Sequence, residues 1–327
     1  MSDPICKLPD YTIDGIGSIE TLSEIFPQNI TSLNIPKIWK RTKGKGVIVA
    51  VLDTGIHLHH DIDKNLDISK CRSFIPNENI FDNVNGHGIH VSGIIAAQLD
   101  EKGIVGVAPE VTIVSVKVLN RFGFSQDNSI VKGLKYCLEL QPDIINLSLG
   151  SESPMPEALE VLKKLVKQNI IVVASAGNTQ KEGLNYPACY DETIAVGSCS
   201  NALFKSRSLF SSWGKELDII APGEEIFSTY LHGKYAVLSG TSQAAPHVSG
   251  IIALIASQYK QQGKVLTLDT VKKILLDNAT DVGMKGFDNE TGWGIIDPDK
   301  MFATLFGEPI PQKISFWQKI KNLFKKK

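Results

Sequence analysis

The chain has 327 residues, of which 43% are hydrophobic and 21% are charged. These proportions are typical of a globular protein and exclude a disordered, collagen-like or coiled-coil chain. The formal net charge is −1, but residues 313–327 hold six lysines and no acidic residue, which leaves −7 on the rest of the chain. An acidic body offers no surface for a polyanion, so we expect no nucleic acid among its partners.

Targeting signals and cysteines indicate the compartment. No apolar run reaches the roughly 18 residues that a transmembrane helix needs. The first residues, Met1-Ser2-Asp3-Pro4, lead into no apolar stretch, so we predict no secretory signal. The five cysteines are widely scattered and form no C-x-x-C pair, which is typical of reduced thiols. We therefore expect a cytoplasmic protein.

Short β-branched segments alternate with helical patterns along the chain. Several of the segments are apolar on consecutive residues, as strands buried on both faces require. The alternation predicts an α/β fold of three layers, in which helices cover both faces of a mostly parallel central sheet. In such a sheet the chemistry lies beyond the carboxyl ends of the strands. Strands are predicted at 47–52, 111–119, 144–149, 170–175, 193–197, 217–221 and 235–238, and helices at 86–97, 127–140, 156–168 and 242–259.

Three polar residues stand where predicted strands end or helices begin. Asp53 follows the first predicted strand, and His87 lies among glycines at the start of the first predicted helix. Ser242 starts the last predicted helix, whose N-terminal end favours negative charge nearby. A serine becomes a nucleophile when a base accepts its proton and a third group fixes the tautomer of that base. His87 and Asp53 can fill these two roles.

The chain order Asp, His, Ser differs from that of the α/β-hydrolases, and their G-x-S-x-G motif does not surround Ser242. With the surrounding motifs, the order resembles the subtilisin family of serine proteases (subtilases), and intracellular subtilisins most. The matching segments span much of residues 35–300: VAVLDTG (49–55), NGHGIHVSG (85–93), GVAP (106–109), NLSLG (146–150), ASAGN (174–178), APG (221–223) and SGTSQAAPHVSG (239–250).

The resemblance implies a serine endopeptidase that acts on peptide or protein substrates through an acyl-enzyme. By matching position, Ser242 is the expected nucleophile, His87 the general base and Asp53 the carboxylate that orients it. The side-chain amide of Asn178 and the backbone N–H of Ser242 are the expected oxyanion donors. The residues that match the substrate-binding segments and the S1 pocket of the family are Gly123, Phe124, Ser125, Ser148, Leu149, Gly150 and Asn185.

Two residues depart from the family pattern. Gln243 follows the nucleophile where many subtilases carry methionine, and we expect the reaction to be unaffected. Phe124 is bulky where the family often has a small residue, so we expect it to restrict the substrate groove.

The resemblance also implies a structural Ca²⁺ site, and no cofactor for catalysis. The stretch before Asp61 is one residue shorter than in the family, so two ordinary loop carboxylates are the alternative. The expected ligands are the carboxylates of Asp61 and Asp100 with the carbonyls of Gln98, Lys102 and Ile104.

We divide the chain into an N-terminal extension (1–40), a catalytic domain (41–307) and a linker with a basic tail (308–327). Leu8-Pro9-Asp10-Tyr11 could cross the groove and make the extension inhibitory, and a disordered terminus is the alternative. On a helical wheel the tail is amphipathic, with apolar residues on one face and lysines on the other. That face is expected either to contact an anionic membrane at the inner membrane face, or to pack on the protein body or a partner subunit of a homodimer.

Two other functions stay open from the sequence. A dedicated leader peptidase, which matures a small peptide such as a lanthipeptide, would cut one site in one partner. A catalytically silent peptide-binding module would use the same groove but lack a member of the triad.

Overall fold

The computed structural model describes residues 6–18, 23–82, 84–125, 128–200 and 206–307. Its centre is a seven-stranded sheet in the order β3-β4-β2-β5-β6-β7-β8, in which every neighbouring pair is parallel. Its strands, in chain order, are β2 (Ile48–Asp53), β3 (Arg72–Ser73), β4 (Thr112–Lys117), β5 (Ile144–Leu147), β6 (Ile171–Ser175), β7 (Ile194–Cys199) and β8 (Ile219–Pro222).

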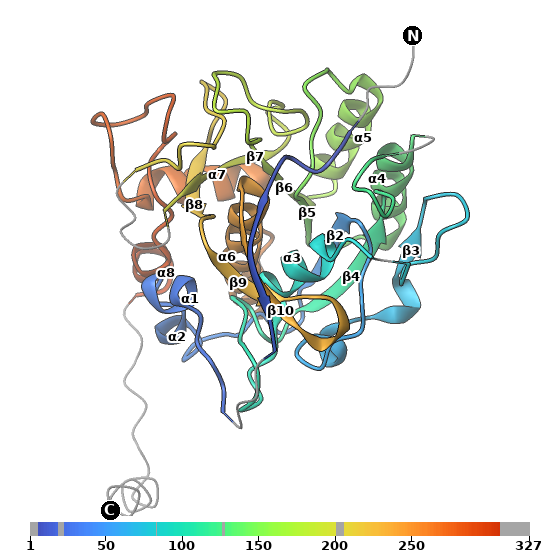
Figure 1. The fold of residues 1–327 in the computed structure, drawn as a ribbon. Helices are drawn as coiled ribbons and strands as arrows, with labels where there is room; N and C mark the ends of the chain where they lie inside the picture. Colours follow the sequence, from blue (N-terminus) through green and yellow to red (C-terminus); the bar gives the residue numbers. More distant parts are fainter. Residues whose placement is uncertain (1–5, 19–22, 83, 126–127, 201–205, 308–327) are drawn as a thin grey trace, which may run out of the picture.

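Two pairs of helices pack with this sheet (Figure 1). One pair is α3 (His87–Ala96) with α6 (Thr241–Gln261); α3 is buried along its whole length, and α6 is buried from Thr241 to Ser257. The other pair is α4 (Ser129–Leu140) with α5 (Pro156–Lys167), which bury one face each and leave charged residues exposed. The expected three-layer α/β fold with a parallel central sheet is confirmed.

A second, antiparallel sheet lies beside the first and includes the start of the chain. It has the order β1 (Thr12–Gly17), β10 (Tyr235–Ser239), β9 (Ile226–Thr229). Figure 1 shows β1 crossing the molecule beside β10. Every residue of β1 is exposed, so this strand is held by its backbone ladder rather than by a buried apolar face.

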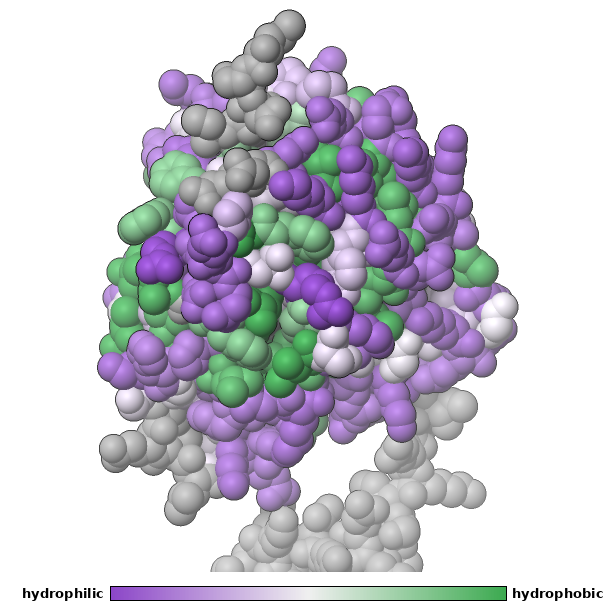
Figure 2. Space-filling model, turned by 90° about the vertical axis from the view of Figure 1, so that its right-hand side faces the viewer, coloured by the Kyte–Doolittle hydropathy of each residue, from purple (hydrophilic) through white to green (hydrophobic). Residues whose placement is uncertain are grey.

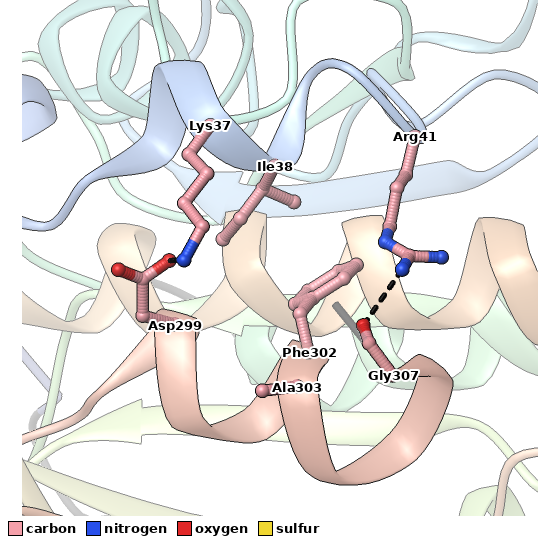
Figure 3. Close-up of a pocket in the computed structure, with 7 residues that line it drawn as sticks. All are labelled: Lys37, Ile38, Arg41, Asp299, Phe302, Ala303 and Gly307. Atoms are coloured by element: carbon pink, nitrogen blue, oxygen red, sulfur yellow. Dashed lines mark hydrogen bonds and ion pairs between the residues drawn. The ribbon is translucent and has the colours of Figure 1, made fainter. Parts of the chain in front are cut away.

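Residues 28–41 pack on the C-terminal part of the body. Helices α1 (Gln28–Ser32) and α2 (Ile35–Ile38) lie near α8 (Pro298–Phe306), which follows α7 (Leu268–Asn278). Lys37 Nζ lies 3.3 Å from Asp299 Oδ1, and Arg41 donates to the Gly307 carbonyl at 2.6 Å (Figure 3). The expected extension 1–40 therefore divides into a segment that crosses the molecule and a helical segment that belongs to its core.

The surface is mostly hydrophilic on the side that carries β3 and α4, with apolar patches between the polar side chains (Figure 2). Within the described ranges, no helix combines the length and the apolarity that crossing a bilayer requires. The basic tail 313–327 lies outside the described residues.

Three short 3₁₀ helices complete the described elements. They are η1 (Asp63–Asn65), η2 (Ile68–Lys70) and η3 (Leu231–Gly233).

Candidate active site

Three buried polar residues lie at the carboxyl edge of the parallel sheet. Asp53 is the last residue of β2, His87 is the first residue of α3, and Ser242 is the second residue of α6. All three are fully buried. The strand order reverses beside β2, which is where open α/β sheets hold their functional groups.

His87 and Asp53 are in direct contact. His87 Nδ1 lies 2.9 Å from both carboxylate oxygens of Asp53, and Asp53 Oδ1 also accepts a hydrogen bond from the Thr54 N–H at 2.7 Å. An ionised carboxylate can only accept, so Nδ1 carries the proton and Nε2 is the basic nitrogen. Nε2 is buried and has no hydrogen-bond partner among the described residues. The imidazole is therefore oriented to take a proton at Nε2.

The Ser242 hydroxyl makes its hydrogen bond elsewhere. Ser242 Oγ donates to the Ser148 carbonyl at 3.1 Å, and Ser148 Oγ donates back to the Ser242 carbonyl at 2.8 Å. Proton transfer to His87 needs a distance of about 2.6–3.2 Å to Nε2. The Ser242 hydroxyl must therefore redirect its hydrogen bond from Ser148 to Nε2 before proton transfer.

Asn178, three residues after β6, presents its amide to a peptide carbonyl. Its Oδ1 accepts from the Thr241 N–H at 3.0 Å and from Thr241 Oγ1 at 2.8 Å. These two bonds fix the amide, so that Nδ2 points outward and donates to the Asp10 carbonyl at 2.5 Å. Such an arrangement can stabilise negative charge on a carbonyl oxygen.

The peptide bound at Asn178 is the start of the same chain. Residues 6–8 lie as a short strand between the two segments that the family resemblance assigns to substrate binding. Leu8 is only 7% exposed and packs against Gly123, whose φ of +81° favours glycine. The backbone bonds, each of 2.8–2.9 Å, join Cys6 to Ser125, Leu8 to Gly123, and Lys7 to Gly150 in both directions.

Tyr11 continues this segment over the histidine. The centroid of its ring lies 5.2 Å from that of His87, and its hydroxyl donates to Asn85 Oδ1 at 3.3 Å. Burial raises the pKa of Tyr11 to about 12, so the phenol stays protonated at neutral pH. The chain then enters β1.

The remaining expected groove residues surround the same segment. Leu149 is buried, whereas Phe124 is 44% exposed and forms part of the groove rim. Asn185 is nearly buried and packs closely on two glycines: a Cβ on Gly150 would lie 2.8 Å from Asn185 Cβ, and one on Gly177 would lie 2.9 Å from its Cγ.

The expected calcium ligands lie in one region with an acid that the sequence did not reveal. Asp61 Oδ2 accepts from the Ile104 N–H and the Tyr235 hydroxyl, both at 2.9 Å, and His60 Nε2 lies 3.1 Å from Asp61 Oδ1. Glu24 Oε2 accepts from the N–H groups at the start of the same loop, of Asp100 and Glu101, at 3.0 and 2.8 Å. No local pattern marks Glu24, because 76 residues separate it from this loop.

These residues fit a cation. Glu24 Oε1 is buried and has no hydrogen-bond partner among the described residues, and Asp61 Oδ1 is buried with His60 Nε2 at 3.1 Å. Burial raises the pKa of both carboxyls, and the charge of Asp100 raises each pKa further. A Cβ on Gly103 would lie 2.2 Å from Asp61 Oδ1, so the glycine leaves room beside that oxygen. The other expected ligands lie in the same region. Asp100 pairs with Lys64 at 2.9 Å, and the Gln98 side chain donates to the His60 carbonyl. Lys102 lies in the same loop, 98–104.

Two further histidines near the site are structural. His90 Nε2 lies 3.1 Å from the carbonyls of Ile226 and Ala236, and His247 Nδ1 lies 2.8 Å from that of Gln243. Burial lowers the pKa of His90 to about 3 and that of His247 to about 4. Both rings are therefore neutral at pH 7. The five cysteines are free, as the sequence predicts.

Comparisons with known proteins agree with this geometry. Residues 44–294 match the model of the subtilase family. The chain is 43% identical over 268 residues to the "Major intracellular serine protease" of Bacillus subtilis (strain 168), covering 79% of this chain and 82% of that protein. It is 43% identical over 238 residues to the "Intracellular serine protease" of Paenibacillus polymyxa, covering 70% and 72%. It is 37% identical over 274 residues to "Subtilisin Savinase" of Lederbergia lenta, covering 84% and 97%. The chain therefore belongs to the subtilase family of serine endopeptidases.

Proposed function

We propose that this subtilase hydrolyses peptide bonds inside the cell through an acyl-enzyme on Ser242. The observation that carries the proposal is the bound segment at residues 6–11, which pairs with both groove segments as a peptide substrate adds a strand. Its Asp10 carbonyl lies on the Asn178 amide, within a site that also contains the His87–Asp53 pair. The two relatives named intracellular serine proteases support the intracellular location.

In acylation, Ser242 Oγ attacks the substrate carbonyl carbon while His87 Nε2 takes its proton. Asp53 keeps Nδ1 protonated and stabilises the imidazolium that forms. Asn178 Nδ2 and the Ser242 N–H bind the oxyanion. His87 then gives the proton to the leaving amine as the C–N bond breaks. Water attacks the ester in the second half, again losing a proton to Nε2, and Ser242 Oγ regains one.

The N-terminal segment (residues 6–17) keeps the enzyme latent in this proposal. It fills the groove, and Tyr11 covers the imidazole on which the reaction depends. Ser242 Oγ donates its hydrogen bond to Ser148 and not to His87, so the Asp10–Tyr11 bond is not attacked in this arrangement. Displacement or cleavage of the segment exposes the groove to other peptides.

Two finer assignments belong to the same proposal. Asp61, Asp100 and Glu24 hold a structural Ca²⁺ ion with backbone carbonyls of the loop 98–104, because buried carboxylates such as Asp61, and Glu24 with its unpartnered Oε1, favour a cation. The ion supplies local charge balance and takes no part in peptide hydrolysis.

The basic tail is proposed to act as an interfacial anchor on anionic membrane. Its charge and amphipathic pattern support this role. The full chain should sediment with anionic vesicles in a salt-sensitive way, and a truncation at Pro311 should not. Equal behaviour of the two proteins would indicate that the tail packs on the protein body or a partner subunit.

The experiment that tests the function maps cleavage of a diverse peptide library by mass spectrometry, with the Ser242→Ala variant as control. We expect cuts at many sites, all absent from the variant, and covalent labelling of Ser242 by phenylmethylsulfonyl fluoride. Full activity of Ser242→Ala would overturn the mechanism. A single cut in a single peptide would favour the leader-peptidase alternative.

A further inference from the structure

The residue after the nucleophile carries a polar side chain that is left unsatisfied within the described part of the chain. Gln243 is fully buried, and neither Oε1 nor Nε2 has a hydrogen-bond partner among the described residues. A buried amide without partners is costly, and in a folded protein such a group calls for an explanation such as a functional role or a bound water.

The Gln243 amide faces the reacting centre. A Cβ built on Gly240 would lie 2.9 Å from Gln243 Oε1, 3.0 Å from Asn178 Nδ2 and 3.4 Å from Tyr11 Cβ. Gln243 Oε1, Asn178 Nδ2 and Tyr11 Cβ therefore all lie close to one position, the Cβ position on Gly240. Because Tyr11 occupies the position of the leaving-group residue, Gln243 Oε1 lies on the leaving-group side of the site.

We infer that Gln243 orients the water that hydrolyses the acyl-enzyme, an inference that rests on the proposed function. By microscopic reversibility, water attacks from the side on which the amine departs. One O–H of this water gives its proton to His87 Nε2 as oxygen bonds to the acyl carbon. The other O–H donates to Gln243 Oε1, which holds the water in line without any covalent change to the amide.

Acylation and deacylation differ in whether the reacting group can donate a hydrogen bond to Gln243 Oε1. In acylation by a p-nitrophenyl ester, the leaving phenolate has no N–H or O–H to donate to Oε1. Deacylation, in contrast, uses the second O–H of water. Loss of the amide should therefore slow deacylation of an ester substrate and leave its acylation rate unchanged.

The test is stopped-flow burst kinetics of the chain after removal of residues 1–18, so that the proposed latency does not limit the rates, with a p-nitrophenyl peptide ester and with rates referred to titrated active sites. In Gln243→Met we expect deacylation to fall by about tenfold, equal to about 1.4 kcal/mol, and acylation to stay within about twofold. The melting temperature should stay level or rise, because methionine removes two unpartnered polar atoms from the interior.

The matched control is Asn278→Leu, which removes from α7 a buried amide whose Nδ2 and Oδ1 each make a hydrogen bond. It should lower the melting temperature and change neither rate. The inference is overturned if Gln243→Met keeps the native deacylation rate. It is also overturned if acylation and deacylation slow together or if the variant is markedly destabilised, because a packing role of Gln243 predicts both of these results. Absence of any burst or acyl-enzyme both in the unmodified chain and after removal of residues 1–18, which relieves the proposed latency, would instead overturn the proposed function.

Discussion

Replacing Leu8 by alanine should weaken the latent state in a measurable way. Leu8 is the apolar anchor of the N-terminal segment, with 7% of its surface exposed and its side chain against Gly123. Burial of a leucine side chain contributes about 1.5–3 kcal/mol, so truncation should remove about 2 kcal/mol from the closed arrangement. Since about 1.4 kcal/mol is a factor of ten, the open fraction should rise about 30-fold.

The assay is the initial rate of peptide hydrolysis by freshly purified full-length protein at low concentration. Mass spectrometry verifies that the N-terminus is intact, so that cleavage between molecules does not contribute. Deletion of residues 1–18 sets the upper limit of activity and leaves Glu24 and Ile25 on the loop 98–104, where Ile25 donates to the Gly103 carbonyl at 2.8 Å.

The matched control is Ile13→Ala, because Ile13 lies on β1 and is already 48% exposed. This variant should change the rate by less than about twofold, since little apolar burial is lost. If Leu8→Ala shows the native rate while the deletion is far more active, the apolar anchor does not hold the segment. If the deletion itself is no more active than the full chain, the segment does not inhibit.

Three further results are expected. Asn178→Ala should lower kcat by about 10²–10³, a range taken from the corresponding substitution in a subtilisin, and an unchanged kcat would exclude an oxyanion role. The free energy of unfolding should fall by about 3 kcal/mol as the pH drops from about 6.5 to 4. The reason is that His247, with a pKa of about 4 in the folded protein, stays neutral there but takes up a proton in the unfolded chain. Urea unfolding of His247→Gln should show a shallower pH dependence, and an identical slope would contradict this account. Millimolar Ca²⁺ should raise the melting temperature relative to EGTA, and less so in Glu24→Gln; equal temperatures in the unmodified chain would refute a calcium site.

Local patterns in the sequence were sufficient for much of the fold. The buried strands β2, β4, β5, β6 and β7 are continuous β-branched or apolar runs, so their positions follow from composition alone, within one or two residues at each end. The placement of Asp53 and His87 at element ends also follows locally, because a strand end and a glycine-flanked helix start are visible in the sequence.

Strand β1 and the short helices α1 and α2 left no such signal in the sequence. Strand β1 contains two glycines and buries no side chain, so neither alternation nor apolar character marks it. It forms only because β10, more than 200 residues away in the chain, presents a free edge to it. The helices α1 and α2 are four to five residues long, too short for a helical period to be recognised, and they are held by packing near α8.

The sequence by itself determined the layer architecture and which residue types could perform nucleophilic catalysis, because burial and spacing act over a few neighbouring residues. Only the tertiary structure decided that the Asp10 carbonyl lies on Asn178, that the Ser242 hydroxyl bonds to Ser148, and that Glu24 accepts from the Asp100 N–H. Each of these contacts joins residues tens to hundreds of positions apart. Their geometry depends on how whole elements pack, and no local pattern in the chain records it.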